Sequence, residues 1–435
     1  MKVDMLIRGC MILTMNRKRE VIDSGLIAIR DGSLQYVGGE EGAPHFDAEK
    51  TIEAQGKIAM PGLINCHTHA PMSLLRGIAE DKDLNTWLRE TIWPLEAKLK
   101  PEDIYYGTLL SCLEMIKNGV TCFADMYFHE DMVAKAVKEA GLRAVLAPGI
   151  IEAGRPMWGR LLFMGAIRTV KRLKGYADGR ITMQLGPHAV YSCTPKLLRM
   201  VRKTASKLKV GIHIHLAESI DEAEEVRSKY GRGEVELLSD MGFLGPDVLA
   251  AHCIHITHED MKILARHGVK VSYNPIANMK LATGIPNVND MIKLGITVGL
   301  GTDGPASNNS LDIFETMKVG ALLQKVRAGD PRTLPVRRVL EMATIMGAEV
   351  LGLSEVVGSL EAGKKADLIL LNLKRPHLTP NHNIYANLVY SARGSDVDTT
   401  IVDGRILMED GEVKTLDEEY VIKKCGEVAS DLISR

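Results

Sequence analysis

The chain has 435 residues, of which 46% are hydrophobic and 25% are charged, and this composition predicts a globular protein with a large core. A formal net charge of -1, with basic residues scattered along the chain, argues against binding to nucleic acid or to an anionic membrane. The seven cysteines form no CxxC pair, and no signal peptide or membrane-spanning run is recognisable, so we expect a cytoplasmic protein without a disulfide framework.

Alternating apolar and polar residues predict β-strands at both ends of the chain. Near the start, DMLIRGCMILTM is followed by GLIAIRDGSLQYVG with its turn at RDGS. Near the end, KADLILLNL, NLVYSA and DTTIVDGRILMEDGEV repeat this character. Both ends of the chain are therefore predicted to form β-strands with the same alternating pattern.

Between these ends, short apolar runs alternate with amphipathic helical stretches such as TPKLLRMVRKTASKLK. Eight strands with intervening helices predict a (β/α)₈ TIM barrel, which is an α/β fold. The eight strands are expected at Ile58–Asn65, Val120–Asp125, Ala144–Ala147, Ile181–Leu185, Val210–Leu216, Val248–Ala251, Val269–Tyr273 and Thr297–Gly301.

Polar residues that follow the apolar runs are the candidates for a site, because catalytic groups of such barrels lie at the carboxyl ends of the strands. The candidates are His67 and His69 after the first strand, His188 after the fourth, His215 and Glu218 after the fifth, His252 after the sixth and Asp303 after the eighth.

A metal site is the simplest use for these residues. His67 and His69 are two apart, so their side chains point to the same side of a strand, and a third imidazole and a carboxylate would complete the coordination. We take His67, His69, His215 and Asp303 as the ligands. His213 has the same spacing relative to His215, but it lies deeper in its run and is expected to be packed inside or to support the site.

A metal held in this way lowers the pKa of a bound water towards neutrality, which indicates hydrolysis. Glu218 would lie beside the metal as a proton shuttle, although it also fits the first turn of a helix. His252 is either a ligand of a second metal or a base. No Lys ends the fourth strand to bridge two metals, so one metal is favoured, with His252 handling protons.

These residues lie in motifs that resemble the amidohydrolase superfamily, in particular its deaminases of 5'-methylthioadenosine, S-adenosylhomocysteine and 5'-deoxyadenosine. The motifs are PGLINCHTHAPMSLLRG, HLAES, AAHCIH, YNPIANMKLATGIPNV and GLGTDGPASNNSLDIFETM. The resemblance implies a catalytic barrel at 58–365 and a small β-sandwich formed by residues 1–57 and 366–435. It also implies one zinc ion per subunit, with iron as an alternative, and a homo-oligomer, either a tetramer or a dimer.

The resemblance further implies the reaction. Water replaces the amino group at C6 of the adenine ring, Glu218 protonates N1, and Glu218, His252 and Asp303 carry protons. The products are an inosine-type nucleoside and ammonia. The residues implied to contact the nucleoside substrate are Trp87, Glu96, Arg160, His188, Glu218 and Ser307.

One position departs from the pattern of relatives that accept S-adenosylhomocysteine. Pro148 stands where some of them carry a second arginine, and proline offers neither a charge nor an N–H donor. We therefore expect short 5' groups to be favoured over a tail that carries a carboxylate, unless Arg155 compensates. The alternative function is deamination or hydrolysis of another heterocycle, such as guanine, cytosine or a triazine, on the same barrel.

Overall fold

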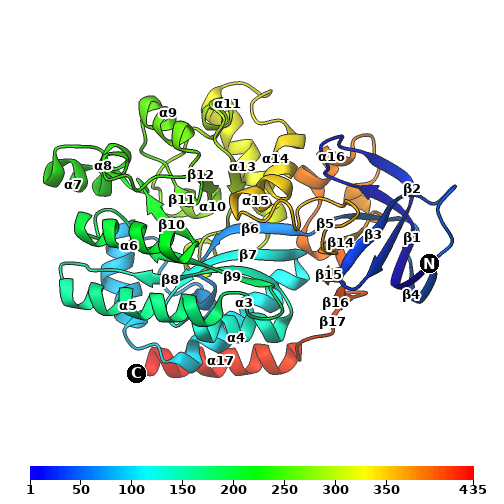
Figure 1. Ribbon diagram of the computed structural model, residues 1–435, viewed down its shortest axis with the longest axis horizontal. Coiled ribbons are helices and arrows are strands. Elements are labelled where there is room, and N and C mark those ends of the chain that lie inside the picture. Colours follow the sequence, from blue (N-terminus) through cyan, green and yellow to red (C-terminus); the bar gives the residue numbers. More distant parts are fainter.

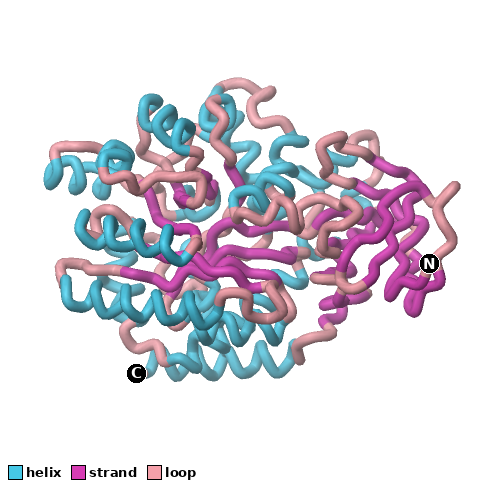
Figure 2. Tube along the Cα trace, in the orientation of Figure 1, coloured by secondary structure: helices cyan, strands magenta, loops and turns pink.

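The computed structural model describes residues 1–435 and contains two sheets. The larger body is an eight-stranded parallel barrel surrounded by helices, and a second sheet built from both termini lies at one side of it (Figures 1 and 2). The predicted TIM barrel and terminal β-domain are therefore confirmed. No helix combines the length and the apolar character that crossing a membrane requires.

The barrel strands follow one another in chain order around the sheet, each paired in parallel with the next. These strands are buried on both faces, as is typical of a parallel sheet. In β7, for example, every residue of VTCFADMY is buried. The barrel strands are β6 (Leu63–Thr68), β7 (Val120–Tyr127), β8 (Arg143–Ile150), β9 (Ile181–Pro187), β10 (Gly211–Leu216), β11 (Val248–His252), β12 (Lys270–Tyr273) and β13 (Val298–Leu300).

The helices that cover the barrel bury one apolar stripe each. In α6, Pro195 opens the helix, the Thr194 hydroxyl accepts a hydrogen bond from the Leu197 N–H, and Leu198 and Val201 are buried at helical spacing. The helices of this layer are α3 (Pro101–Lys117), α4 (Glu130–Ala140), α5 (Pro156–Leu173), α6 (Pro195–Leu208), α7 (Ile220–Tyr230), α8 (Glu234–Asp240), α9 (His258–His267), α10 (Pro275–Lys280), α11 (Val288–Lys293), α12 (Pro305–Asn308), α13 (Ile313–Ala328), α14 (Val336–Met342) and α15 (Ile345–Val350).

Hydrogen bonds between the first and last strands close the barrel. The Asp303 N–H donates to the His67 carbonyl at 2.9 Å, and Asn65 and Thr302 exchange two hydrogen bonds of 2.7 and 3.0 Å. Gly301 permits this close approach, since a Cβ there would stand 3.0 Å from the backbone nitrogen of His67. Two predicted site residues, His67 and Asp303, are thereby fixed side by side.

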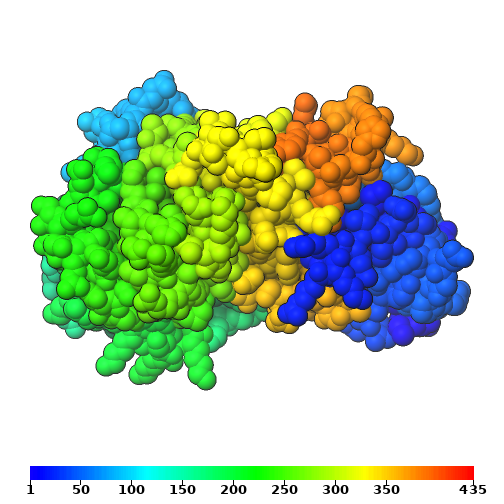
Figure 3. Space-filling model, turned by 90° about the horizontal axis from the view of Figure 1, so that it is seen from above, coloured from blue at the N-terminus to red at the C-terminus, as the bar shows by residue number.

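The C-terminal strands form one side of the second sheet and the N-terminal strands form the other, and Figure 3 shows the blue N-terminal segment beside the orange C-terminal one. The sheet order is β17-β16-β15-β14-β5-β1-β2-β3, and β4 pairs with β1. The strands are β1 (Lys2–Leu13), β2 (Val21–Arg30), β3 (Ser33–Gly39), β4 (Asp47–Glu53), β5 (Lys57–Pro61), β14 (Leu368–Asn372), β15 (Val397–Val402), β16 (Arg405–Glu409) and β17 (Glu412–Val413).

Three segments differ from the sequence-based expectation. The single strand expected at 58–65 is two strands: β5 belongs to the terminal sheet, and β6 starts the barrel after Gly62. The segment NLVYSA is not a strand; residues 387–391 form a π-helical turn, η4 (Asn387–Ser391). The final helix α17 (Glu418–Ser434) lies along α3 of the barrel rather than in the sheet (Figure 1).

A short irregular region between β6 and α3 runs across the carboxyl ends of the strands. It contains a 3₁₀ helix, a turn of α-helix, a π-helical turn and a second turn of α-helix, and its side chains form one wall of the cavity described below. Its elements are η1 (Ala70–Leu75), α1 (Leu84–Thr86), η2 (Trp87–Ile92) and α2 (Trp93–Glu96).

Candidate active site

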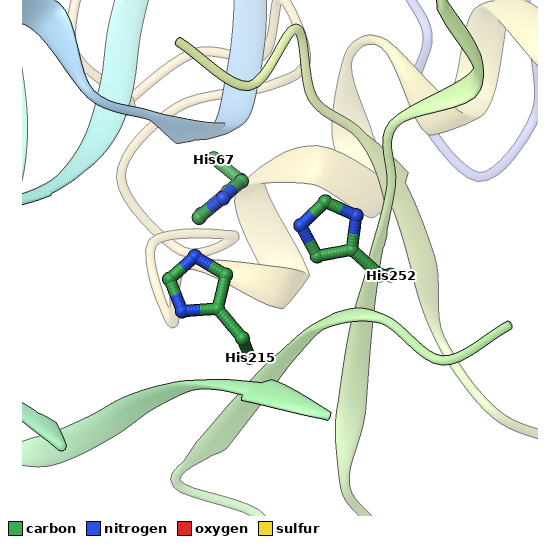
Figure 4. Close-up of side chains that lie close together, drawn as sticks. All are labelled: His67, His215 and His252. Carbon is green, nitrogen blue, oxygen red and sulfur yellow. The ribbon is translucent and has the colours of Figure 1, made fainter. Parts of the chain in front are cut away.

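The four residues predicted as metal ligands meet at the carboxyl ends of the barrel strands. His67 lies in β6, His69 directly follows this strand, His215 lies in β10, and Asp303 follows β13. Figure 4 shows the rings of His67, His215 and His252 turned towards a common point. In each of three overlapping groups drawn from these residues and Glu218, the potential ligand atoms lie within 4.8 Å of one another.

The distances between these groups fit a cation. Asp303 Oδ1 lies 3.3 Å from the Nε2 atoms of both His67 and His69, and the Nε2 atoms of His69 and His215 are 3.3 Å apart. The Nε2 atoms of His67 and His252 are buried without any hydrogen-bond partner. Buried polar atoms of this kind are rare in proteins unless an ion or water satisfies them.

The partners of the opposite ring nitrogens explain the orientation of these imidazoles. His69 Nδ1 donates to the Met126 carbonyl at 2.6 Å, and His215 Nδ1 donates to the His188 carbonyl at 2.8 Å. A carbonyl oxygen can only accept, so the proton of each ring is on Nδ1 and the lone pair of Nε2 faces the centre. This is the tautomer that binds a metal through Nε2.

Two further residues contact the outer ring nitrogens of these histidines, and the sequence indicated only one of the two. His213 Nε2 lies 2.8 Å from His67 Nδ1, which fits the expected supporting position of this histidine. Asn278 Oδ1 lies 2.8 Å from Nδ1 of His252 and was not identified from the sequence. Asn278 lies in the quoted motif YNPIANMK, but no residue type or spacing in that motif points to an imidazole partner.

Burial keeps the imidazoles neutral. It lowers the pKa of His67 to about 4 and the pKa of His215 well below its usual value. Burial alone would raise the pKa of the Asp303 carboxyl, but its close contacts with His67 and the other neighbouring imidazoles hold that pKa well below its usual range. Neutral imidazoles and an ionised carboxylate are the forms that bind a metal.

Glu218 lies beside this group, and its pKa is raised above the usual value of a carboxyl group. Its carboxyl oxygen Oε1 is 3.7 Å from His252 Nδ1, and burial together with the nearby Asp303 raises the pKa of Glu218 to about 8. Two further carboxylates hold the backbone here: Glu222 accepts from the Glu218 N–H at 3.0 Å, and Glu234 accepts from the Ala217 N–H at 3.2 Å. A carboxyl group protonated near neutral pH is suited to act as an acid.

A cavity of about 1130 Å³, including its open outer end, extends from this group of residues to the surface. Of the residues predicted to contact substrate, Trp87, Glu96, His188 and Glu218 line it. The Tyr127 hydroxyl donates to Glu96 Oε1 at 2.6 Å, and burial raises the pKa of Glu96 to about 7.

The structure does not bring the other two predicted substrate residues to the cavity wall. Ser307 is buried beneath it, where its hydroxyl donates to Asp303 Oδ2 at 2.8 Å, so it supports Asp303 instead. Arg160 is exposed on α5, and neither it nor Arg155 lines the cavity. Pro148 is buried within β8 and also lies off the wall.

Comparisons with known proteins agree with this geometry. The sequence model described as "Amidohydrolase family" matches residues 58–407. The chain belongs to the amidohydrolase family. Members of this family are metal-dependent, so this amidohydrolase is a metal-dependent enzyme.

Two curated relatives match this amidohydrolase along nearly their whole length. A 5-methylthioadenosine/S-adenosylhomocysteine deaminase of Desulforamulus reducens and a 5'-deoxyadenosine deaminase of Methanosarcina acetivorans are each 48% identical over 432 residues, covering 99% of both chains. The crystal structure of an adenosine deaminase from Xanthomonas campestris with bound zinc superposes with a TM-score of 0.96 at 30% identity, covering 100% of this chain and 99% of that one.

Proposed function

We propose that this amidohydrolase deaminates the adenine ring of 5'-modified adenosines: 5'-deoxyadenosine, 5'-methylthioadenosine and S-adenosylhomocysteine. One observation carries the proposal. A single cavity joins the convergent imidazoles and Asp303 at its floor to Glu218 and Glu96 on its walls. Such a site combines groups for hydrolysis with a carboxylate that suits two ribose hydroxyls, and the names of the two relatives support the same substrates.

His67, His69, His215 and Asp303 would hold one zinc ion per subunit, with iron as the alternative, since imidazole and carboxylate accept both metals. When bound, such an ion supplies a water acidic enough to be deprotonated near neutral pH. Of the four rings near Asp303, His252 is assigned to proton transfer, because its Nδ1 also lies near Glu218.

The remaining steps use the side chains of this protein. Glu218, protonated near neutral pH, gives a proton to N1 of the purine, while His252 and Asp303 take up and return protons as water is consumed. Oxygen replaces the amino group at C6, and that group leaves as ammonia. Glu96 accepts hydrogen bonds from the two ribose hydroxyls, and His188 contacts the edge of the purine.

Ammonia release tests the proposal. The zinc-loaded protein should turn over the three 5'-modified adenosines with far higher kcat/KM than guanine, cytosine or a chlorinated triazine, and prolonged dialysis against a chelator should abolish this activity until zinc is restored. Turnover of the free bases or the triazine alone would contradict the proposal and favour the alternative heterocycles.

Replacement of Glu96 by Ala separates nucleosides from free bases. The variant loses the acceptor for two hydroxyls, and a hydrogen bond to a charged group contributes about 1.5–3 kcal/mol. We expect kcat/KM for 5'-methylthioadenosine to fall roughly 10- to 150-fold, mostly through KM, in steady-state assays. An unchanged KM would exclude Glu96 from ribose binding, and a Glu90→Ala variant, changed at an exposed carboxylate nearby, serves as the control.

His213 offers a test of the metal site that does not depend on activity. Loss of its contact with His67 Nδ1 removes the group that orients this ligand. We expect His213→Ala to weaken zinc binding about 10- to 100-fold, measured by competition with a chromophoric chelator. His213→Gln, which keeps an acceptor, should recover part of the loss. Wild-type affinity in the Ala variant would show that His213 has only a packing role.

A further inference from the structure

The hydroxyl of Tyr127 joins two parts of the cavity wall that are held in different ways. Tyr127 is the last residue of β7, a strand in which every residue is buried. Glu96 is the last residue of α2, a single helical turn in which no residue is buried. Both side chains line the cavity. A side chain fixed in the barrel thereby contacts one on a wall segment that is not itself buried.

The position of Tyr127 is fixed by the turn that follows β7. His129 has a φ of 51°, which is uncommon for a residue with a side chain, and this turn directs Glu130, at the start of α4, back to the end of the strand. The Tyr127 N–H donates to Glu130 Oε1 at 3.0 Å, and Glu130 is only 1% exposed. Tyr127 is therefore held both by the strand and by a buried carboxylate.

Few other interactions hold Glu96 in place. The Tyr127 hydroxyl donates to Glu96 Oε1 at 2.6 Å, and this is the only hydrogen bond that a side chain of α2 makes. The neighbouring Trp93 and Leu95 are half-buried. Glu96 Oε2 has no partner within the protein. The orientation of the Glu96 carboxylate therefore depends on Tyr127.

Recognition of two ribose hydroxyls needs a carboxylate with both oxygens in position. An ionised carboxylate has about four acceptor sites, and Tyr127 occupies one of them on Oε1. The second site of Oε1 and the sites of Oε2 are left for the substrate. Burial raises the pKa of Glu96 to about 7, and the hydrogen bond from Tyr127 opposes this rise, so it favours the ionised form that accepts hydroxyls.

We propose that Tyr127 is a positioning residue for ribose recognition: its hydroxyl fixes the Glu96 carboxylate so that Glu96 accepts hydrogen bonds from the 2'- and 3'-hydroxyls together. This assignment rests on the proposed deaminase function and adds a residue that determines its specificity for the ribose. An unrestrained Glu side chain loses conformational entropy when it binds a ligand. Because Tyr127 holds Glu96, that freedom is lost before the substrate arrives.

The test measures kcat and KM of the zinc-loaded wild-type enzyme and of Tyr127→Phe for 5'-methylthioadenosine and for its 2',3'-dideoxy analogue. Phe keeps the ring in the cavity wall and removes only the hydroxyl. We expect kcat/KM for 5'-methylthioadenosine to fall about tenfold, mostly through KM, because one hydrogen bond to a charged group is lost. The dideoxy analogue offers Glu96 no hydroxyls, so its kcat/KM should change little.

A double-mutant cycle with Glu96→Ala shows whether the hydroxyl acts through Glu96. In the Glu96→Ala background, Tyr127→Phe should cause no further loss of kcat/KM for 5'-methylthioadenosine. The same loss in both backgrounds would show that the hydroxyl contacts the substrate itself, and would overturn the assignment.

The matched control is Tyr105→Phe. The Tyr105 hydroxyl also donates to a glutamate, Glu139 Oε2, at 2.5 Å, but this bond joins α3 to α4 away from the cavity. Its loss should leave the ratio of kcat/KM for the two substrates unchanged. A changed ratio in this variant would show that the effect is not specific to the cavity wall.

Other results would contradict the assignment in distinguishable ways. An unchanged KM for 5'-methylthioadenosine in Tyr127→Phe, or equal losses for both substrates, would exclude a role of the hydroxyl in ribose recognition. Loss of zinc, determined in parallel, would place its effect at His69, whose ring centroid lies 6.2 Å from that of Tyr127. Failure of the wild-type enzyme to release ammonia from either nucleoside would overturn the proposed function, and the role of Tyr127 with it.

Discussion

Replacement of Glu218 by Gln is expected to lower kcat about 10²- to 10⁴-fold while leaving the protein folded and able to bind zinc. Gln is similar in size to Glu but cannot give a proton to N1 of the purine. Burial and Asp303 raise the pKa of Glu218 to about 8, so the wild-type carboxyl group holds this proton near neutral pH. The measurement is single-turnover deamination of 5'-methylthioadenosine, with the zinc content determined in parallel.

The measurement of zinc content distinguishes a role of Glu218 in proton transfer from a role as a metal ligand. Glu218 lies close enough to His252 and Asp303 to be a ligand itself, and a large loss of zinc in the Gln variant would assign it to the metal rather than to proton transfer. Glu224→Gln, a change at an exposed carboxylate of α7 that does not line the cavity, should retain wild-type kcat. A Glu218→Gln enzyme with nearly full kcat would exclude Glu218 as the acid.

Replacement of Asp367 by Asn is expected to lower the free energy of unfolding by about 3–5 kcal/mol. Arg143 at the start of β8 donates two hydrogen bonds, of 2.7 and 3.0 Å, to this carboxylate, and the two side chains are only 5% and 1% exposed. Asp367 also accepts from the Asp403 N–H at 2.8 Å. Without the carboxylate, the Arg143 guanidinium stays buried with Asp403, 3.8 Å away, as its remaining carboxylate neighbour.

Urea titration followed by circular dichroism measures this effect. The control is Glu53→Gln, which breaks the exposed Arg8–Glu53 pair of 2.7 Å and should cost less than about 1 kcal/mol. If Asp367→Asn unfolded within 1 kcal/mol of the wild-type protein, the Arg143–Asp367 pair would contribute little to joining the barrel to the terminal sheet.

Much of the site was predictable because side chains along a β-strand point alternately to its two faces. His67 and His69 are two residues apart at the end of β6, and the barrel fold brings the ends of distant strands together. Their meeting with His215 and Asp303 therefore follows from the pattern of apolar runs. The same rule could not choose between His213 and His215, which also share a face. Their depths in the barrel distinguish them: His213 contacts the rear nitrogen of His67, and His215 faces the cavity.

The predicted substrate residues that do not line the cavity lie outside the strands. Ser307 lies in the short helix α12 and Arg160 in the long helix α5, where a motif gives the residue but not the direction of its side chain. Ser307 donates a hydrogen bond to Asp303, and Arg160 is exposed. The segment NLVYSA was expected as a strand, yet it forms the π-helical turn η4, whose Leu388 and Val389 are buried and which packs beside α13. Tertiary packing there outweighs the β-propensity of Val and Tyr.

The pairing of an N-terminal with a C-terminal strand constrains the order in which the chain is made and folded. β5 pairs with β1 on one side and with β14 on the other, and the whole barrel is synthesised between β5 and β14. Until β14 leaves the ribosome, one edge of β5 has unpaired backbone groups next to the apolar side chains of Ile58 and Met60. Such an edge invites pairing with another chain, so rapid completion of the barrel, which brings β14 into place, protects the newborn protein from aggregation.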